Sequence, residues 1–142
     1  MSINKFKVNE EGLNRFFGAL EAKIMEVIWA AGEQNIKQVQ EKLSLESPIS
    51  FNAVNTVMNR LVDKEHLSRH TKGRTTYYHA VQSKEEFLHE QTKSVTLGLI
   101  EDFGGLVASH FVEALEQVDT SFLQQLEDKL NELKKRNENN GS

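Results

Sequence analysis

The fold is decided by residues 50–82, which read SFNAVNTVMNRLVDKEHLSRHTKGRTTYYHAVQ. The first part of this stretch has apolar residues at the spacing of an amphipathic helix, namely Val54, Val57, Met58, Leu61 and Val62. Ser50 is a favourable N-cap for that helix because its hydroxyl can accept a hydrogen bond from the first turn. The sequence therefore predicts a helix that begins directly after Ser50.

The second part of the stretch predicts a β-hairpin. Residues 67–72 and 75–81 are rich in Thr, Tyr and Val, and they flank Gly73 and Arg74. A two-residue connection that contains glycine is typical of a tight hairpin turn. Two cations, Lys72 and Arg74, therefore lie at the exposed tip of the predicted hairpin.

Two more amphipathic patterns precede this stretch. Residues 17–31 have the spacing of a helix, and Gly32 follows as a helix stop. Residues 36–43 repeat the helical pattern over two to three turns. Three helices followed by a hairpin with a basic tip is the order of a winged helix-turn-helix. The predicted fold class is therefore mainly α with a small β-hairpin wing, followed by a helical dimerisation domain.

The chain after Gln82 predicts helices that pair with a second copy. Ser83 is a favourable N-cap for a helix that runs to about Phe103 and ends at Gly104 and Gly105. Two further helical segments follow, and the residues predicted to lie in a dimer interface are Phe111, Leu115, Phe122, Leu123, Leu126, Leu130 and Leu133. The last four leucines of this list, from Leu123 to Leu133, are three, four and three residues apart, as in a coiled-coil seam.

These patterns divide the chain into two predicted domains. Residues 1–82 form the winged helix-turn-helix domain, with 1–15 as an N-terminal extension, and residues 83–142 form the dimerisation domain with a frayed tail at 137–142. The net charge is -4, but residues 1–82 carry 11 Lys and Arg against 9 Asp and Glu, whereas residues 83–142 carry 6 against 12. This asymmetry favours a nucleic-acid partner for the first domain.

Composition excludes several classes of protein. The chain has no cysteine, which excludes disulfides, thiolate metal sites and cysteine nucleophiles. It has no glycine-rich phosphate loop, nucleophile elbow or metalloprotease helix motif, so we predict no enzymatic activity and no cofactor. Because we find neither a run of about 18 apolar residues nor a secretory signal, we expect a cytoplasmic protein without membrane insertion.

The polar face of the helix after Ser50 carries the candidate DNA-binding residues. Amides, a hydroxyl and a guanidinium can bond base edges in a major groove, and wing cations can reach phosphates or the minor groove. The predicted contacts to double-stranded DNA are Ser50, Asn52, Asn55, Thr56, Asn59, Arg60, Lys64, Lys72, Arg74 and Thr75. The alternative is an ordinary solvated helix face and a solubilising turn.

The hairpin also contains conceivable metal ligands. His66 and His70 lie in or beside its first strand, and His79 lies in its second strand. Their spacing is loose, and neither a cysteine nor an obvious third ligand accompanies them, so we predict no metal site. The sequence leaves open whether these histidines bind a metal. Trp29, at the end of the first helix, is predicted to pack in the core and not to stack on bases.

Several segments resemble the penicillinase-repressor family, the BlaI/MecI-like transcriptional repressors. Residues 17–29, FGALEAKIMEVIW, look like the opening helix of the family, and residues 55–61, NTVMNRL, look like its recognition helix. Residues 74–78 are similar to the family's wing, and Phe103-Gly104-Gly105 to a bend before its dimerisation helices. The resemblance covers about residues 16–135.

This resemblance implies a homodimer that binds a palindromic operator, often with TACA and TGTA half-sites, and represses antibiotic resistance or stress genes. In antibiotic-responsive members a membrane sensor protease triggers cleavage near the start of the dimerisation domain. The matching bond here falls near Thr96 and Leu97, without the Asn-Phe pair of the staphylococcal proteins. Control by a C-terminal cysteine cluster, as in copper-responsive members, is excluded. The alternative function is a winged-helix module that binds protein without reading DNA.

Overall fold

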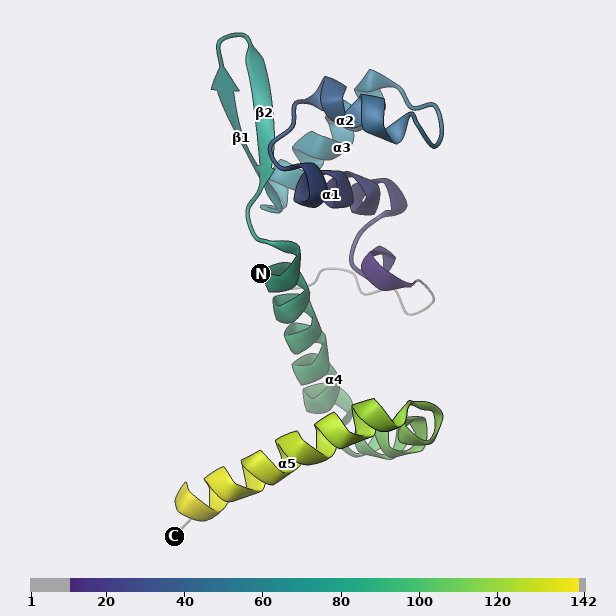
Figure 1. The fold of residues 1–142 in the computed structure, drawn as a ribbon, viewed down its shortest axis with the longest axis vertical. Coiled ribbons are helices and arrows are strands. Elements are labelled where there is room, and N and C mark those ends of the chain that lie inside the picture. The colour runs from purple at the N-terminus through teal and green to yellow at the C-terminus, as the bar shows by residue number, and fades with distance from the viewer. Residues whose placement is uncertain (1–10, 141–142) are drawn as a thin grey trace. The chain divides into compact units, whose positions relative to one another are not determined.

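The first part of the chain folds into a winged helix-turn-helix (Figure 1). The computed structural model describes residues 11–140. Three helices precede one antiparallel hairpin, which confirms the predicted fold class. In chain order the elements are the 3-10 turn η1 (Gly12–Arg15), α1 (Ala19–Ala31), α2 (Ile36–Leu43), α3 (Phe51–Asp63), β1 (Leu67–Lys72), β2 (Thr75–Ala80), α4 (Lys84–Ala114), the 3-10 turn η2 (Leu115–Gln117) and α5 (Thr120–Asn140).

The chain divides into two compact units, residues 1–96 and 97–142. The beginning of α4, up to Thr96, thus belongs to the same unit as the winged helix. The predicted domain boundary after Gln82 stays a prediction. Residues 1–10 of the predicted N-terminal extension and residues 141–142 of the predicted tail lie outside the described residues.

Polar side chains determine where the helices of the winged unit begin. At α2, the Asn35 side chain accepts from the Gln38 amide at 2.8 Å, while the Gln38 side chain accepts from the Asn35 amide at 2.8 Å. Ser50 Oγ accepts from the Ala53 amide at 3.1 Å, and Ser83 Oγ accepts from the Glu86 amide at 3.1 Å. Each bond satisfies an amide that the first turn of a helix leaves without a partner.

The core of the winged unit lies between the three helices and the hairpin. Its fully buried side chains come from every one of these helices and from β1, and the largest are Ile24, Met25, Ile28, Met58, Leu61, Leu67, Val39 and Val54. Helix α3 buries Val54, Val57, Met58 and Leu61, as its sequence period predicts. The opposite face of α3 is consequently left outside the core.

A cluster of rings joins the beginning of α4 to the helices before it. Phe87, which is buried, stacks on Phe17 at 4.9 Å between ring centroids and meets Trp29 at 5.6 Å and His66 at 5.7 Å. The indole Nε1 of Trp29 donates to the carbonyl of Gln82 at 2.9 Å. Trp29 is therefore half-buried and packs against the core, as predicted.

The wing is a hairpin with a short third segment beside it. Strands β1 and β2 pair from Leu67 opposite Ala80 to Lys72 opposite Thr75. Gly73 begins the two-residue turn with φ of 64°, a conformation that costs glycine no strain. On the outer side of β2, Gln34 forms an isolated antiparallel bridge with Tyr78.

The second unit contains the rest of α4, the turn η2 and helix α5. The backbone leaves helical geometry at Gly104 (φ 22°, ψ -94°), where the sequence predicts a helix end, and helical structure then continues to Ala114. Helix α5 is capped by Asp119, whose carboxylate accepts from the Phe122 amide at 2.9 Å. It continues to Asn140, beyond the Asn137 at which we expected fraying. No glycine or proline interrupts this segment before Gly141.

One stretch is long and apolar enough to cross a membrane by length and composition alone. It runs from Lys84 to Gln117 and reaches a mean hydropathy of 1.3 over 18 residues. Ser, Thr, Gly, His and charged residues interrupt this stretch, so it is not a continuous apolar run, and the expectation of a protein without membrane insertion stays a prediction. The criterion by itself is also met by core helices of water-soluble proteins.

Candidate nucleic-acid interface

Helix α3 presents a polar strip to the outside of the winged unit. Asn52, Thr56 and Arg60 are exposed, and Asn55 is half-buried at the edge of the strip. All four lie on the side of the helix away from Val54, Met58 and Leu61. Their amides, hydroxyl and guanidinium are of the types that hydrogen-bond base edges in a major groove.

Asn59 has a different environment from the other polar residues of α3. Its amide nitrogen donates to the backbone carbonyl of Asn55 at 2.9 Å and to the Asn55 side-chain oxygen at 2.8 Å. Its amide oxygen accepts from the Tyr78 hydroxyl at 3.1 Å and from Arg69. These bonds engage both ends of the Asn59 amide and tie α3 to both strands of the wing. They also hold the Asn55 side chain in one orientation.

Two more predicted contacts are engaged within the fold. Ser50 caps α3, so its hydroxyl already accepts a backbone hydrogen bond. Lys64, at the end of α3, forms an ion pair with the nearly buried Glu21 of α1 at 3.0 Å. The structure thus contains the Ser50 cap that the sequence predicts, whereas the pairing of Lys64 with Glu21 is not visible in the sequence pattern.

The tip of the wing carries the remaining predicted contacts. Arg74 is exposed in the turn, and Thr75 is half-buried at the start of β2. Lys72 lies 5.7 Å from the centre of the Tyr77 ring, and its Nζ is 3.6 Å from a carboxylate oxygen of Glu33. Exposed ion pairs of this length are weak, so a phosphate can compete for the Lys72 ammonium.

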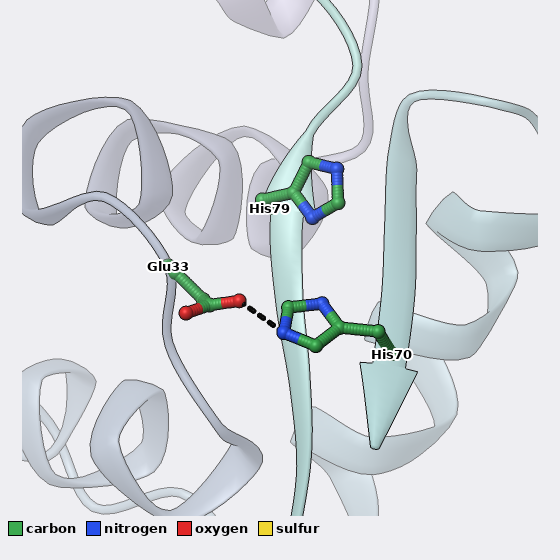
Figure 2. Close-up of side chains that lie close together, drawn as sticks. All are labelled: Glu33, His70 and His79. Carbon is green, nitrogen blue, oxygen red and sulfur yellow. Dashed lines mark ion pairs between the residues drawn. The ribbon is translucent and has the colours of Figure 1, made fainter. Parts of the chain in front are cut away.

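The three histidines named as conceivable ligands do not come together. His66 packs edge-on against Phe17 and Phe87, and burial lowers its pKa, with the nearby Lys64 ammonium acting in the same direction and the Glu21 carboxylate opposing it. His70 and His79 instead lie beside Glu33, as Figure 2 shows. The third group, Glu33, was missed because it lies far from the hairpin in sequence and only the Gln34–Tyr78 bridge brings it there.

Two further residues near the polar strip were not identified from the sequence. Phe51, the first residue of α3, leaves 46% of its surface exposed beside the polar strip. An exposed aromatic ring at this place can contact a thymine methyl group. Arg69 lies on β1 and bonds to Asn59, which places a further cation next to α3. Because side chains alternate along a strand, Arg69 and His70 lie on opposite faces of β1. This alternation is the sequence signal that could have identified Arg69.

Two solved structures that are similar to part of this chain are of the repressor BlaI. One is the solution structure of the DNA-binding domain of the repressor BlaI, with 26% identity, a TM-score of 0.45, and coverage of 54% of this chain and 93% of that chain. Another is the Bacillus licheniformis BlaI monomeric form in complex with the blaP half-operator, with 28% identity, a TM-score of 0.43, and coverage of 49% and 85%. A comparison with curated protein sequences found no match.

A match at the level of a whole family covers most of the chain. The sequence profile of the penicillinase repressors matches residues 17–132, which include the three helices, the wing and most of the helical unit. The match takes in both α3, with its exposed polar strip, and the wing beside it. The chain therefore belongs to the penicillinase repressor family of DNA-binding transcriptional regulators.

Proposed function

We propose that this chain is a cytoplasmic, sequence-specific repressor that binds a palindromic operator as a homodimer. The observation that carries the proposal is the exposed polar strip of α3, with Asn52, Thr56 and Arg60, next to a wing tipped by Lys72 and Arg74. In this arrangement α3 enters the major groove and reads base edges, while the wing binds phosphates. The buried face of α3 is held in the core, so the strip is presented rigidly.

The individual roles follow from what each side chain is free to do. Asn55 and Arg60 discriminate between bases, and Asn52, Thr56 and Phe51 add contacts at the beginning of α3. Lys72, Arg74 and Thr75 contact the phosphate backbone. Asn59, Ser50 and Lys64 act through their bonds within the fold, which fix the position of α3.

The second copy of the chain covers the apolar surface of the helical unit. In α5, Leu123, Leu130 and Leu133 leave 40%, 46% and 44% of their surface exposed, and Leu126 between them is half-buried. In α4, an open apolar groove is lined by Leu99, Phe103, Leu106, Val107, His110 and Phe111. Water-soluble monomers rarely expose so large an apolar area. A second apolar surface must therefore cover it, and another copy of the chain supplies such a surface.

The proposed control by a membrane sensor protease rests on the position of the matching bond. Thr96 and Leu97 are both exposed, and the two compact units of the chain divide between them. Cleavage there separates the operator-reading unit from the proposed dimer interface. Because the bond lies inside helix α4, and Thr96 Oγ1 bonds to the Thr92 carbonyl at 2.8 Å, the helix must open locally before a protease can cut it.

Fluorescence anisotropy of labelled DNA tests the proposal against the alternative of a protein-binding module. The probe is the operator recovered by sequencing genomic fragments that the purified chain retains, and a scrambled duplex of equal length is the control. We expect affinity to fall steeply between 50 and 200 mM salt, by about 10³-fold or more if six phosphates are contacted. Equal and salt-independent binding of both duplexes would favour the protein-binding module.

A further inference from the structure

The pairing of the wing with the segment after α1 brings three possible metal ligands to one face. Gln34 and Tyr78 exchange two backbone hydrogen bonds, of 3.0 Å and 2.8 Å, which sets the preceding Glu33 beside His79. His79 pairs with Ser68 on β1, and His70 pairs with Tyr77. Since side chains alternate along a strand, His70 and His79 share the face opposite Arg69 and Tyr78, the residues that bond to α3.

The geometry of this cluster is close to that of a metal site. One ligand atom from each of Glu33, His70 and His79 lies within 4.8 Å of the other two. His70 Nε2 is 2.6 Å from a Glu33 oxygen, and the two imidazole rings are 5.9 Å apart between centroids (Figure 2). Ligand atoms around a tetrahedral Zn²⁺ are about 3.3 Å apart, given metal–ligand distances of about 2.0–2.1 Å. All three side chains are exposed or half-buried, so they are free to rotate toward a shared ion.

We propose that Glu33, His70 and His79 form a binding site for a divalent cation of the zinc class. Two imidazoles and one carboxylate are a donor set that Zn²⁺ takes, with water in the fourth position. Mg²⁺ and Ca²⁺ prefer all-oxygen sites, and Cu⁺ prefers sulfur ligands, which none of these three residues supplies. The site takes its ligands from both strands of the wing and from the segment after α1.

Metal binding changes the charge and the mobility of the wing. The cation takes over the Glu33 carboxylate, which now attracts both His70 and the Lys72 ammonium at 3.6 Å. Lys72 is thereby released toward solvent, and the wing gains positive charge. A cation held by β1, β2 and the Glu33 segment also cross-links three stretches of backbone, so it stabilises the folded winged unit. Neither effect requires that the chain bind DNA.

Isothermal titration calorimetry with ZnCl2 and the untagged full-length chain tests the site directly. We expect saturable binding of one Zn²⁺ per chain and a higher melting temperature with Zn²⁺ than with a chelator. Loss of an outer-shell partner already weakens metal sites about 10–100-fold, so His79→Ala and Glu33→Gln should each weaken binding by at least about 10-fold. Glu33→Gln retains the shape of the side chain and guards against a loss caused by misfolding.

Two further variants make the outcome decisive. His89→Ala removes an exposed histidine of α4 that is outside the cluster, and it should bind Zn²⁺ as the parent does. Lys72→Ala removes the competing cation and should strengthen binding. The proposal is overturned if the parent chain shows no saturable binding, if His79→Ala and Glu33→Gln bind as tightly as the parent, or if His89→Ala weakens binding as much as they do. No arm of the experiment contains DNA, so the operator-binding proposal stands or falls separately.

Discussion

Replacement of Phe87 by alanine removes the side chain that joins the beginning of α4 to the winged unit. Phe87 is 2% exposed and packs against the rings of Phe17, Trp29 and His66 at 4.9–5.7 Å. Deletion of a buried phenylalanine side chain costs about 3–5 kcal/mol. Because aromatic pairs add about 0.5–1.5 kcal/mol beyond the area that they bury, we expect a value in the upper half of that range.

The assay is urea unfolding of the full-length chain followed by tryptophan fluorescence. Trp29 is the only tryptophan, and it lies in the same ring cluster, so its signal reports the unfolding of the winged unit. The matched control is Val112→Ala in the second unit, where 65% of the Val112 surface is exposed and the residue is outside the proposed dimer interface. We expect this control to change the free energy of unfolding seen by Trp29 by less than about 0.5 kcal/mol.

The outcome decides where the winged unit ends. A loss below about 1 kcal/mol for Phe87→Ala would mean that the beginning of α4 adds little to the stability of this unit. It would then refute the inference that the first part of α4 is integral to the fold of the winged helix. An equal loss for Val112→Ala would show that Trp29 does not report the winged unit alone.

The remaining predictions concern pH and assembly. The lowered pKa of His66 means that the unfolded chain takes up a proton more readily than the folded chain, so the free energy of unfolding should fall as the pH decreases below about 6.5. In urea titrations at several pH values His66→Gln should flatten this slope, and an unchanged slope would assign it to other groups. Leu126→Asp combined with Leu130→Asp should give a folded monomer by sedimentation and reduce operator affinity by about 10²-fold, since the second half-site contact is no longer tethered. A double variant that still sediments as a dimer would place the interface elsewhere.

Local patterns predicted most of the winged unit because its signals are short in range. The helical period of residues 51–63, the Ser50 cap and the glycine in the hairpin turn all act between near neighbours in sequence, and all appear in the structure. The fraying expected at 137–142 stays a prediction, although helix α5 continues to Asn140, because polar residues alone do not stop a helix and no glycine follows Asn137 before Gly141.

The side-chain environments at the candidate interface could not be predicted because they depend on contacts distant in sequence. Asn59 has the residue type of a base-reading amide, yet Arg69 and Tyr78 of the wing engage it. Lys64 has the residue type of a phosphate contact, yet Glu21 of α1 pairs with it. Glu33 joins His70 and His79 only through the bridge between Gln34 and Tyr78. The spacing of residues along the chain does not reveal any of these long-range contacts.

The most direct test of the central claim compares Asn55→Ala with Lys72→Ala on the recovered operator and on random duplex DNA. Asn55 lies at the edge of the polar strip of α3, whereas Lys72 lies at the wing tip. Asn55→Ala should cost about 1–3 kcal/mol on the operator and little on random DNA, and Lys72→Ala should weaken both equally. If Asn55→Ala weakens binding to both duplexes equally, α3 does not read bases and the proposed mechanism of recognition is wrong.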